Sequence, residues 1–452
     1  MILALMFNLT PYYFIHYADP QIGRNPSAFP NCTLAVHQIA VLNPAPSFII
    51  IAGDMGESQN DTVVLKTQWH LCDSLFNLIP ASGYFTPGNH DIGYASDAFW
   101  TPQRLSLYRS FWGADYFSFD YDSCHFVVLN STLLDTYSGH SCYPYSLEQD
   151  SFLRADLSNL VPETYHHIFL LFHFPLYVSS PAEANSLNNV DRPRRDTILA
   201  NLVKYNVTAV FTGHLHYNLQ NFYGPSILIG GLTTSETNIN ACGYRVVKVF
   251  DRGIETYTIW LNAPQTSVPL VQAVAPGVSP ETVQVGQTVL FNCIVDSIQF
   301  PEWQGLTYRW QFGDGQSSVM PNTNHAYADT GHFNVVFAAY KNPNLSAHYH
   351  FQIVVLSGQK VGEGTINYRD VSRFRIIPSV TKDCISFEMD ADADIRIDVY
   401  QIDGRILLSN DYHRLSKGVH KFELKKSLNP GIYFLRWTAK GRTGIEKFVL
   451  IY

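Results

Sequence analysis

Residues 84–91 read Tyr84-Phe85-Thr86-Pro87-Gly88-Asn89-His90-Asp91, so that a short apolar strand runs directly into a Gly-Asn-His-Asp turn. An apolar run followed by residues that bind metals recurs four times elsewhere in the first half of the chain. Ligands of open α/β sheets bind outside the carboxyl ends of the strands, so we expect these side chains to meet at one edge. The other four runs and the residues that follow them are 12–17 with Asp19-Pro20-Gln21, 47–52 with Gly53-Asp54, 167–172 with His173, and 207–212 with Gly213-His214-Leu215-His216.

The alternation of apolar runs and amphipathic helical stretches from residue 12 to about 260 predicts an α/β fold. Several strands are nearly continuous in Ile, Leu, Phe and Val, as expected for a sheet covered by helices on both faces. Beyond residue 271 the helix patterns vanish, and short alternating strands predict two small all-β sandwich domains. We therefore divide the chain into residues 1–11, at most the remnant of a signal segment, an α/β domain at 12–262, and β domains at 268–357 and 370–452.

Composition and charge exclude several classes of protein. The 452 residues, enough for about two to four domains, carry 30 Lys and Arg against 38 Asp and Glu, a net charge of −8. This balance argues against nucleic acid as a structural partner, because backbone phosphates require a basic footprint. The seven cysteines are scattered without a Cys-x-x-Cys pair, which argues against a cysteine zinc site. No stretch approaches the roughly 18 apolar residues of a membrane span, so we expect none.

The five strand ends together supply three Asp, one Asn, one Gln and four His. The i, i+2 spacing of Asp19 with Gln21, and of His214 with His216, would place each pair on one side of an extended backbone. Each motif alone is weak, because a Gly-Asp after a strand is usually only a turn, but all five in this order indicate a site. Imidazole and carboxylate ligands suit Mn, Fe or Zn, and the lack of thiolates argues against a structural zinc.

These motifs resemble the calcineurin-like metallophosphoesterase superfamily, which is marked by Asp-x-His, Gly-Asp, Gly-Asn-His-Asp/Glu, a separate His, and Gly-His-x-His. The resemblance covers about residues 12–260 and implies a β-sandwich flanked by helices, with four layers in the order α/β/β/α. It also implies two metal ions and a proton donor for the leaving group. By position, Asp19, Gln21 and His216 would hold the first metal, Asn89, His173 and His214 the second, Asp54 would bridge them, His90 would be the proton donor, and Asp91 would orient His90.

Gln21 departs from the superfamily pattern, which has histidine at this place. A neutral amide oxygen binds a metal less tightly than an imidazole, so we expect the first metal to be the more labile. Asp19-Pro20-Gln21-Ile22-Gly23 is similar to the calcineurin-like phosphoesterase domain-containing protein 1 branch, as are residues 112–119, 128–131 and the Gly243-x-Arg245-Val-Val stretch. That branch contains a protein phosphatase that acts on phosphoserine, but the substrate does not carry over at such a distance.

The predicted chemistry is hydrolysis of a phosphate ester. Two cations ~3.5–4 Å apart would lower the pKa of a bridging water, and the resulting hydroxide would attack phosphorus without a protein nucleophile. A phosphomonoesterase is favoured. A phosphodiesterase or nucleotidase uses the same metals and stays open, as does an adhesion or glycan-binding protein whose phosphoesterase domain is inactive.

The two β domains carry resemblances of their own. Residues 268–356 resemble a polycystic-kidney-disease (PKD) domain through Trp310-Gln-Phe312-Gly-Asp-Gly315 and the 325–335 segment. A spacer role is favoured for it, and contact with a surface or glycan stays open. Residues 370–452 resemble a type IX secretion C-terminal sorting domain of Bacteroidetes-type bacteria, through Asp403-Gly-Arg405 and Leu428-Asn-Pro-Gly431-Ile-Tyr433. This resemblance implies the type IX secretion machinery as a partner and a secreted or cell-surface location.

Overall fold

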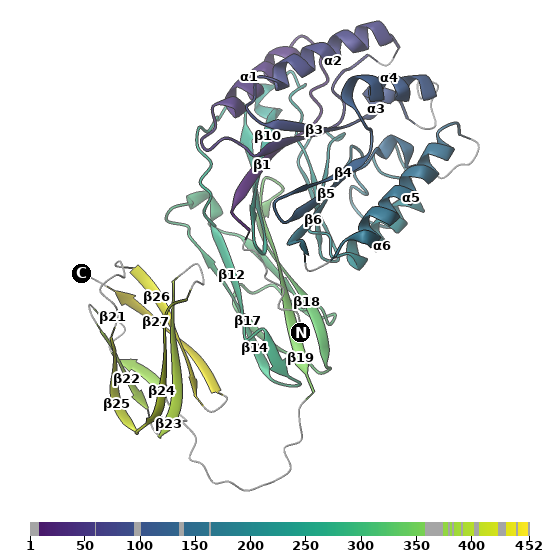
Figure 1. Ribbon diagram of the computed structural model, residues 1–452. Helices are drawn as coiled ribbons and strands as arrows, with labels where there is room; N and C mark the ends of the chain where they lie inside the picture. Colours follow the sequence, from purple (N-terminus) through teal and green to yellow (C-terminus); the bar gives the residue numbers. More distant parts are fainter. Residues whose placement is uncertain are drawn as a thin grey trace. The chain divides into compact units, whose positions relative to one another are not determined.

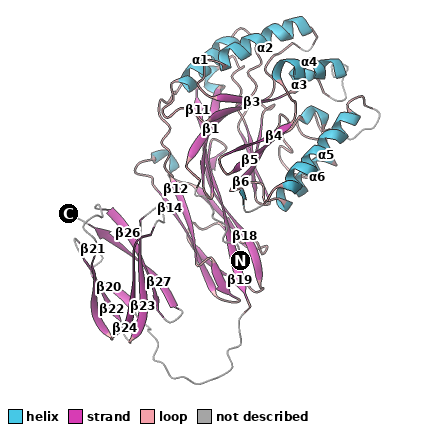
Figure 2. Ribbon diagram, in the orientation of Figure 1, coloured by secondary structure: helices cyan, strands magenta, loops and turns pink. Residues whose placement is uncertain are grey.

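Two mixed β-sheets stack face to face in the first 260 residues (Figures 1 and 2). In the first sheet β1 lies between β10 and β2, antiparallel to β10 and parallel to β2. The second sheet has the order β4-β5-β6-β7-β9-β8. The strands of the first sheet are β1 (Tyr12–Tyr17), β2 (Phe48–Ala52), β3 (Ser82–Thr86), β10 (Gly243–Phe250) and β11 (Gly253–Trp260), and those of the second are β4 (Phe117–Tyr121), β5 (Cys124–Val128), β6 (His167–Leu171), β7 (Ala209–Thr212), β8 (Leu219–Tyr223) and β9 (Ser226–Gly230).

Helices cover the outer face of each sheet, so the predicted α/β/β/α layering is confirmed (Figure 2). The core between the sheets is rich in phenylalanine: Phe14 and Phe48 of the first sheet contact Phe126 of the second with ring centroids 5.6 and 5.2 Å apart. Helices α1 (Ala28–Ala40), α2 (Thr62–Phe76) and α4 (Pro102–Trp112) pack on the first sheet, α5 (Tyr143–Asn159) and α6 (Arg194–Lys204) pack on the second, and the short α3 (Asn89–Ile92) follows β3.

The first sheet continues beyond the α/β layers. The last strand of its α/β part, β11, pairs antiparallel with β19, and β18, β15 and β16 extend the sheet further. A second, three-stranded sheet, in the order β12-β14-β17, shares a core with this extension, which contains Trp310 and Phe312. The predicted sandwich after residue 268 is present, but one of its sheets is shared with the α/β region. Its strands are β12 (Val274–Ser279), β13 (Thr282–Gln284), β14 (Thr288–Val295), β15 (Thr307–Gln311), β16 (Ser317–Ser318), β17 (Thr323–Ala326), β18 (Gly331–Asn342) and β19 (Leu345–Leu356).

Residues up to 358 form one compact unit, and residues 359–452 form another. The second unit has a three-stranded sheet, β20-β22-β25, and a five-stranded sheet, β21-β27-β26-β23-β24, around a core that includes Phe387 and Leu435. It is therefore the second predicted β-sandwich. Its strands are β20 (Phe374–Ile377), β21 (Val380–Thr381), β22 (Cys384–Met389), β23 (Ala393–Gln401), β24 (Ile406–Leu415), β25 (Gly418–Glu423), β26 (Gly431–Ala439) and β27 (Arg442–Leu450).

This computed structural model describes most of the chain. Residues 1–8, which make up most of the expected signal remnant, lie outside the described residues, as does the boundary segment 358–373. Among the helices that are described, none is both long and apolar enough to cross a bilayer. The described ranges are 9–58, 60–94, 101–134, 140–161, 164–357, 374–377, 380–381, 384–389, 392–401, 406–423, 431–439 and 442–450.

Candidate metal centre

The five strand ends place all seven predicted ligands around one point between the two sheets. Asp19 and Gln21 follow β1, Asp54 follows β2, and Asn89 begins α3 directly after β3. From the second sheet, His173 follows β6, while His214 and His216 follow β7. Most of these side chains are buried: Asp19, Gln21, Asp54, Asn89 and His173 are each at most 3% exposed.

Asp54 lies at the middle of the group. Its Oδ2 is 3.3 Å from Nε2 of His173 and 3.4 Å from Nε2 of Gln21. The same His173 nitrogen is 3.0 Å from Oδ1 of Asn89. One ligand atom each from Asp54, His173 and His214 lie within 4.8 Å of one another, close enough to share a metal ion.

Asp19 lies beside two of the proposed histidine ligands, His216 and His173. Its Oδ1 is 3.8 Å from Nε2 of His216 and 3.9 Å from Nδ1 of His173. Its carboxylate also accepts hydrogen bonds from the backbone N–H of His214 at 3.0 and 2.9 Å, which ties the end of β1 to the end of β7. The two carboxylates thus approach different edges of the His173 ring: Asp54 is near Nε2 and Asp19 is near Nδ1.

Outer partners fix the orientation of all three imidazoles. Nδ1 of His173 donates to the Ala52 carbonyl at 2.7 Å, and Nε2 of His214 donates to the Leu187 carbonyl at 2.8 Å. Nδ1 of His216 is 3.1 Å from Oε1 of Glu236. A metal-binding histidine almost always gives its second nitrogen to such a partner, which leaves the other nitrogen for the metal. In His173, His214 and His216 the nitrogens so left are Nε2, Nδ1 and Nε2.

The backbone at the ligands is strained. Asp19, Gln21, Asp54, His214 and His216 have φ between +36° and +70°, and only three other non-glycine residues of the described chain have positive φ. Each left-handed residue costs about 1–3 kcal/mol and persists only where its surroundings fix it. The sequence argument that each i, i+2 pair shares an extended backbone is therefore wrong. Turns in the left-handed region bring the pairs together instead.

Two glycines are required for close approach. A Cβ atom at Gly88 would lie 2.0 Å from Oδ1 of Asp54, and one at Gly213 would lie 2.8 Å from Oδ2 of Asp19. Both distances are far below van der Waals contact, so any side chain here would displace a carboxylate of the centre. This is the physical reason why glycine precedes Asn89 and His214 in the sequence.

The charges of the site point to a cation. Burial raises the pKa of Asp19, whereas His173 and His90 outweigh burial and hold the pKa of Asp54 well below its usual range. Burial lowers the pKa of His173, but Asp54 outweighs it and raises that pKa to about 9. A proton on Nε2 of His173 then occupies the place that a cation would take. Burial, together with His173, lowers the pKa of His214 to about 3, which keeps this imidazole neutral, as a ligand must be.

His90 faces the centre without being one of the proposed ligands. Its Nε2 is 4.0 Å from Oδ2 of Asp54, while its Nδ1 lies 3.2 Å from the carbonyl oxygen and 3.4 Å from Oε2 of Glu57. Sequence reasoning missed Glu57, and its place three residues after Asp54 is the only signal that could have found it. The partners recorded for the Asp91 carboxylate are the N–H groups of Met55, Gly56, Gly88 and the Trp69 indole, at 2.9 to 3.3 Å. It ties the β2 and β3 loops together, and its expected role in orienting His90 stays a prediction.

The amide of Gln21 is turned so that its nitrogen faces Asp54. Its Oε1 accepts hydrogen bonds from Arg24 Nη1 and Ser235 Oγ, both at 2.9 Å. The Arg24 guanidinium is also 3.7 Å from Glu236, the partner of His216. Gln21 can therefore hold a metal through oxygen only if its amide rotates and gives up these two donors.

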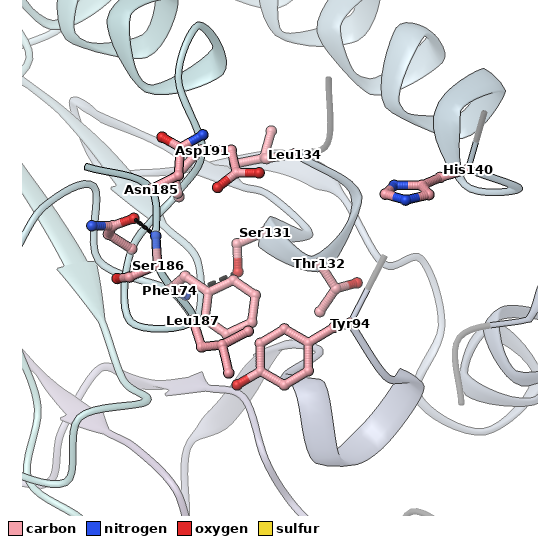
Figure 3. A pocket seen from close by; sticks show the side chains of 12 residues that line it. Tyr94, Ser131, Thr132, Leu134, His140, Phe174, Asn185, Ser186, Leu187 and Asp191 are labelled. Carbon is pink, nitrogen blue, oxygen red and sulfur yellow. Dashed lines mark hydrogen bonds between the residues drawn. The ribbon is translucent and has the colours of Figure 1, made fainter. Parts of the chain in front are cut away.

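A cavity of about 310 Å³ opens beside the centre (Figure 3). Phe174, next to His173 in sequence, and Leu187, whose carbonyl holds His214, form part of its wall. The Tyr94 ring stacks on Phe174 with centroids 5.3 Å apart. No lysine or arginine is among the described residues that line the cavity, which are Tyr94, Ser131, Thr132, Leu134, His140, Phe174, Asn185, Ser186, Leu187, Asn189, Val190 and Asp191.

Residues 12–218, which contain every predicted ligand, match the family model for calcineurin-like phosphoesterases. Residues 12–218 form a calcineurin-like phosphoesterase domain. This phosphoesterase is an enzyme of a metal-dependent family, and its donor set of carboxylates, imidazoles and amides fits the metal ions that the family requires.

Known relatives of this phosphoesterase include the serine/threonine-protein phosphatase CPPED1. The cattle (Bos taurus) protein is 29% identical over 262 residues, covering 53% of this chain and 80% of the relative. The zebrafish (Danio rerio) protein is also 29% identical over 262 residues, covering 54% of this chain and 83% of the relative. Among solved structures, a dimetal phosphatase from Danio rerio has a TM-score of 0.45 at 11% identity, covering 55% of this chain and 96% of that one.

Two later parts of the phosphoesterase chain match further family models. Residues 273–353 match the PKD domain, and residues 375–451 match the secretion system C-terminal sorting domain. Both resemblances drawn from the sequence are therefore confirmed.

Proposed function

We propose that this phosphoesterase is an exported phosphomonoesterase that uses two metal ions. The observation that carries the proposal is a group of the buried Asp19, Asp54, Asn89 and His173 with the half-buried His214 and His216, in which both carboxylates lie within 3.9 Å of a ring nitrogen of His173. In this proposal Asp54, which lies near both His173 and Gln21, would bridge the two ions, and Asp19 and His216 would hold the first of them. When bound, two such ions lower the pKa of a water and hold the phosphoryl oxygens for in-line attack.

The proton donor in this proposal is Nε2 of His90. Glu57 engages Nδ1 through both its carbonyl and its carboxylate, so the ring presents Nε2 to the centre. A departing alkoxide oxygen needs this proton, because it is a poor leaving group without it. The donor lies outside the proposed ligand set, so it can be removed without removing a metal ligand.

The residues that line the cavity beside the centre support a substrate whose leaving group carries no further phosphate. Phe174 and Tyr94 offer aromatic surface, Asn185 and Ser186 offer polar groups, and Asp191 is a carboxylate in the lining. The described lining contains no lysine or arginine that could bind a second phosphate group of a substrate. The relatives' name as serine/threonine-protein phosphatases makes alkyl monoesters the first substrates to test.

The experiment compares an alkyl ester, such as O-phosphoserine, with p-nitrophenyl phosphate in the wild type and in His90→Ala. General acid catalysis contributes ~10²–10⁴ in rate. We expect kcat/KM to fall by that factor for the alkyl ester and by less than about tenfold for the aryl ester, whose leaving group needs little protonation. His37→Ala, at an exposed position of α1, is the matched control, and bound metal is counted in all three proteins.

If His90→Ala lowers kcat/KM equally for the two esters, His90 binds the phosphate group and does not donate a proton to the leaving group. A wild type that holds two metal ions yet hydrolyses neither ester would overturn the proposed activity and favour a binding protein. Preference for a diester such as bis-p-nitrophenyl phosphate would favour the phosphodiesterase alternative.

A further inference from the structure

The loop that carries His214 and His216 ends at Asn218, directly before β8. The Asn218 side chain is held by three hydrogen bonds, in two of which Nδ2 donates to Thr258 Oγ1 at 3.1 Å and to Asn344 Oδ1 at 2.5 Å. Its Oδ1 accepts from Nη2 of Arg245 at 2.6 Å. His214 and His216 are both left-handed, so this loop (residues 213–218) needs such outside contacts to keep its conformation.

Arg245 of β10 connects Asn218 to the PKD-like region. It is 1% exposed, and its Nη2 also donates to the carbonyl of Pro343 at 2.7 Å. Its Nη1 donates to Thr256 Oγ1 at 3.2 Å. A buried guanidinium is costly unless its N–H groups are bonded, so the Pro343 carbonyl is part of what allows Arg245 to lie behind the loop.

Pro343 and Asn344 form the turn between β18 and β19 and are themselves held in place. The Asn344 carbonyl accepts a hydrogen bond from the Thr258 N–H at 3.0 Å, and β19 pairs with β11 beyond it. Further along β19, Nε2 of His348 donates to the Pro225 carbonyl at 2.7 Å, in the turn between β8 and β9. The turn is thus bonded to β11 of the first sheet, and the strand that follows it is bonded to the second.

From this chain of contacts we infer that the β18–β19 turn of the PKD-like region positions the histidines of the metal centre. Asn344 and Asn218 are positioning residues: they touch neither substrate nor the proposed ligand atoms and act through the 213–218 loop. The inference rests on the proposed metal centre. It gives the PKD-like region a part in metal binding rather than a spacer role alone.

The test measures Mn²⁺ affinity by calorimetry on full-length protein, together with the melting temperature of the metal-free form. Loss of a direct outer partner of a ligand costs ~10–100-fold in metal affinity. Asn344 acts on the ligands only through Asn218 and the 213–218 loop, so we expect Asn344→Ala to weaken Mn²⁺ binding by no more than the low end of that range, about tenfold. Asn344→Asp keeps the acceptor for Asn218 and should stay within about twofold of wild type. Asn334→Ala, at an exposed position near the far end of the same hairpin, is the matched control.

Asn218→Ala is a second variant: it removes both the donor to Asn344 and the acceptor for Arg245, and should weaken Mn²⁺ binding at least as much as Asn344→Ala does. Wild-type Mn²⁺ affinity in both folded variants would overturn the inference. If those variants also hydrolyse esters normally, the proposed function stands and only this inference fails. If the wild type binds no Mn²⁺, Zn²⁺ or Fe²⁺, both fail.

Discussion

At the scale of single residues, the sequence reveals which side chains are the candidate ligands of the site. It does not reveal the backbone conformation that brings them together. The residue types at positions 19, 54, 89, 173, 214 and 216 could be recognised because each follows an apolar strand. The left-handed backbone of five of the seven could not, because positive φ is uncommon for any residue other than glycine, and the enrichment of Asp and His there is too weak to single out these positions. Glu57 and Glu236 were missed for a related reason: they hold imidazoles and lie outside the motifs.

Gln21 gives a prediction at this scale. Its Oε1 already accepts from Arg24 and Ser235, so a metal at the Asp19/Gln21/His216 site competes with two donors. We expect mild chelation to remove one of the two ions first, and Gln21→His to make that ion harder to remove. Metal analysis after stepwise chelation measures both effects. Two ions that leave together from the wild type, or an unchanged order in Gln21→His, would contradict this.

At the scale of elements, parallel strands explain why distant motifs meet. β1, β2 and β3 run parallel in one sheet, and β6 and β7 run parallel in the other, so their carboxyl ends lie at the same side of the sandwich. The apolar runs predicted these strands. Nothing in the sequence of β11 or β19 predicted that they pair, because any edge strand offers the same backbone groups to a partner. The shared sheet was therefore not foreseen.

The contact between β19 and the second sheet predicts a dependence of stability on pH. Burial, together with Arg309, lowers the pKa of His348 to about 4, and burial lowers that of the nearby His167 to about 4 as well. Unfolded histidine titrates near ~6.5, so the unfolded chain takes up protons first as the pH falls. The stability is therefore complete above that pH and is lost between pH ~6.5 and ~4, at about 1.4 kcal/mol per pH unit for each histidine.

His348→Gln tests this, because glutamine can still donate to the Pro225 carbonyl but does not titrate. We expect the loss in free energy of unfolding between pH 7.5 and 5.5 to be smaller in the variant by roughly 1 kcal/mol. Urea denaturation of metal-free protein at both pH values measures it, with His37→Gln as the control at an exposed position. An identical loss in His348→Gln and wild type would show that His348 does not carry the effect.

At the scale of the whole molecule, chemistry and export belong to different units. Every proposed ligand, His90 and the β18–β19 turn lie before residue 358, in the first compact unit. The sorting domain at 375–451 lies in the second, which has its own core around Phe387 and Leu435. The sequence could predict this division because the two β regions differ in their motifs, although it could not show that the PKD-like region shares a sheet with the enzyme.

Deletion of residues 359–452 should therefore leave metal content and kcat/KM unchanged in purified protein, because the first unit keeps its sheets, its cores and its site. In the native host the same deletion should keep the enzyme inside the cell, since it removes the segment that matches a secretion sorting domain. The measurements are phosphatase activity of the purified truncated protein and the share of enzyme found outside the cells. A folded truncated protein that has lost hydrolysis would place part of the catalytic unit in the tail. Undiminished export would show that the sorting domain is not what directs this protein outward.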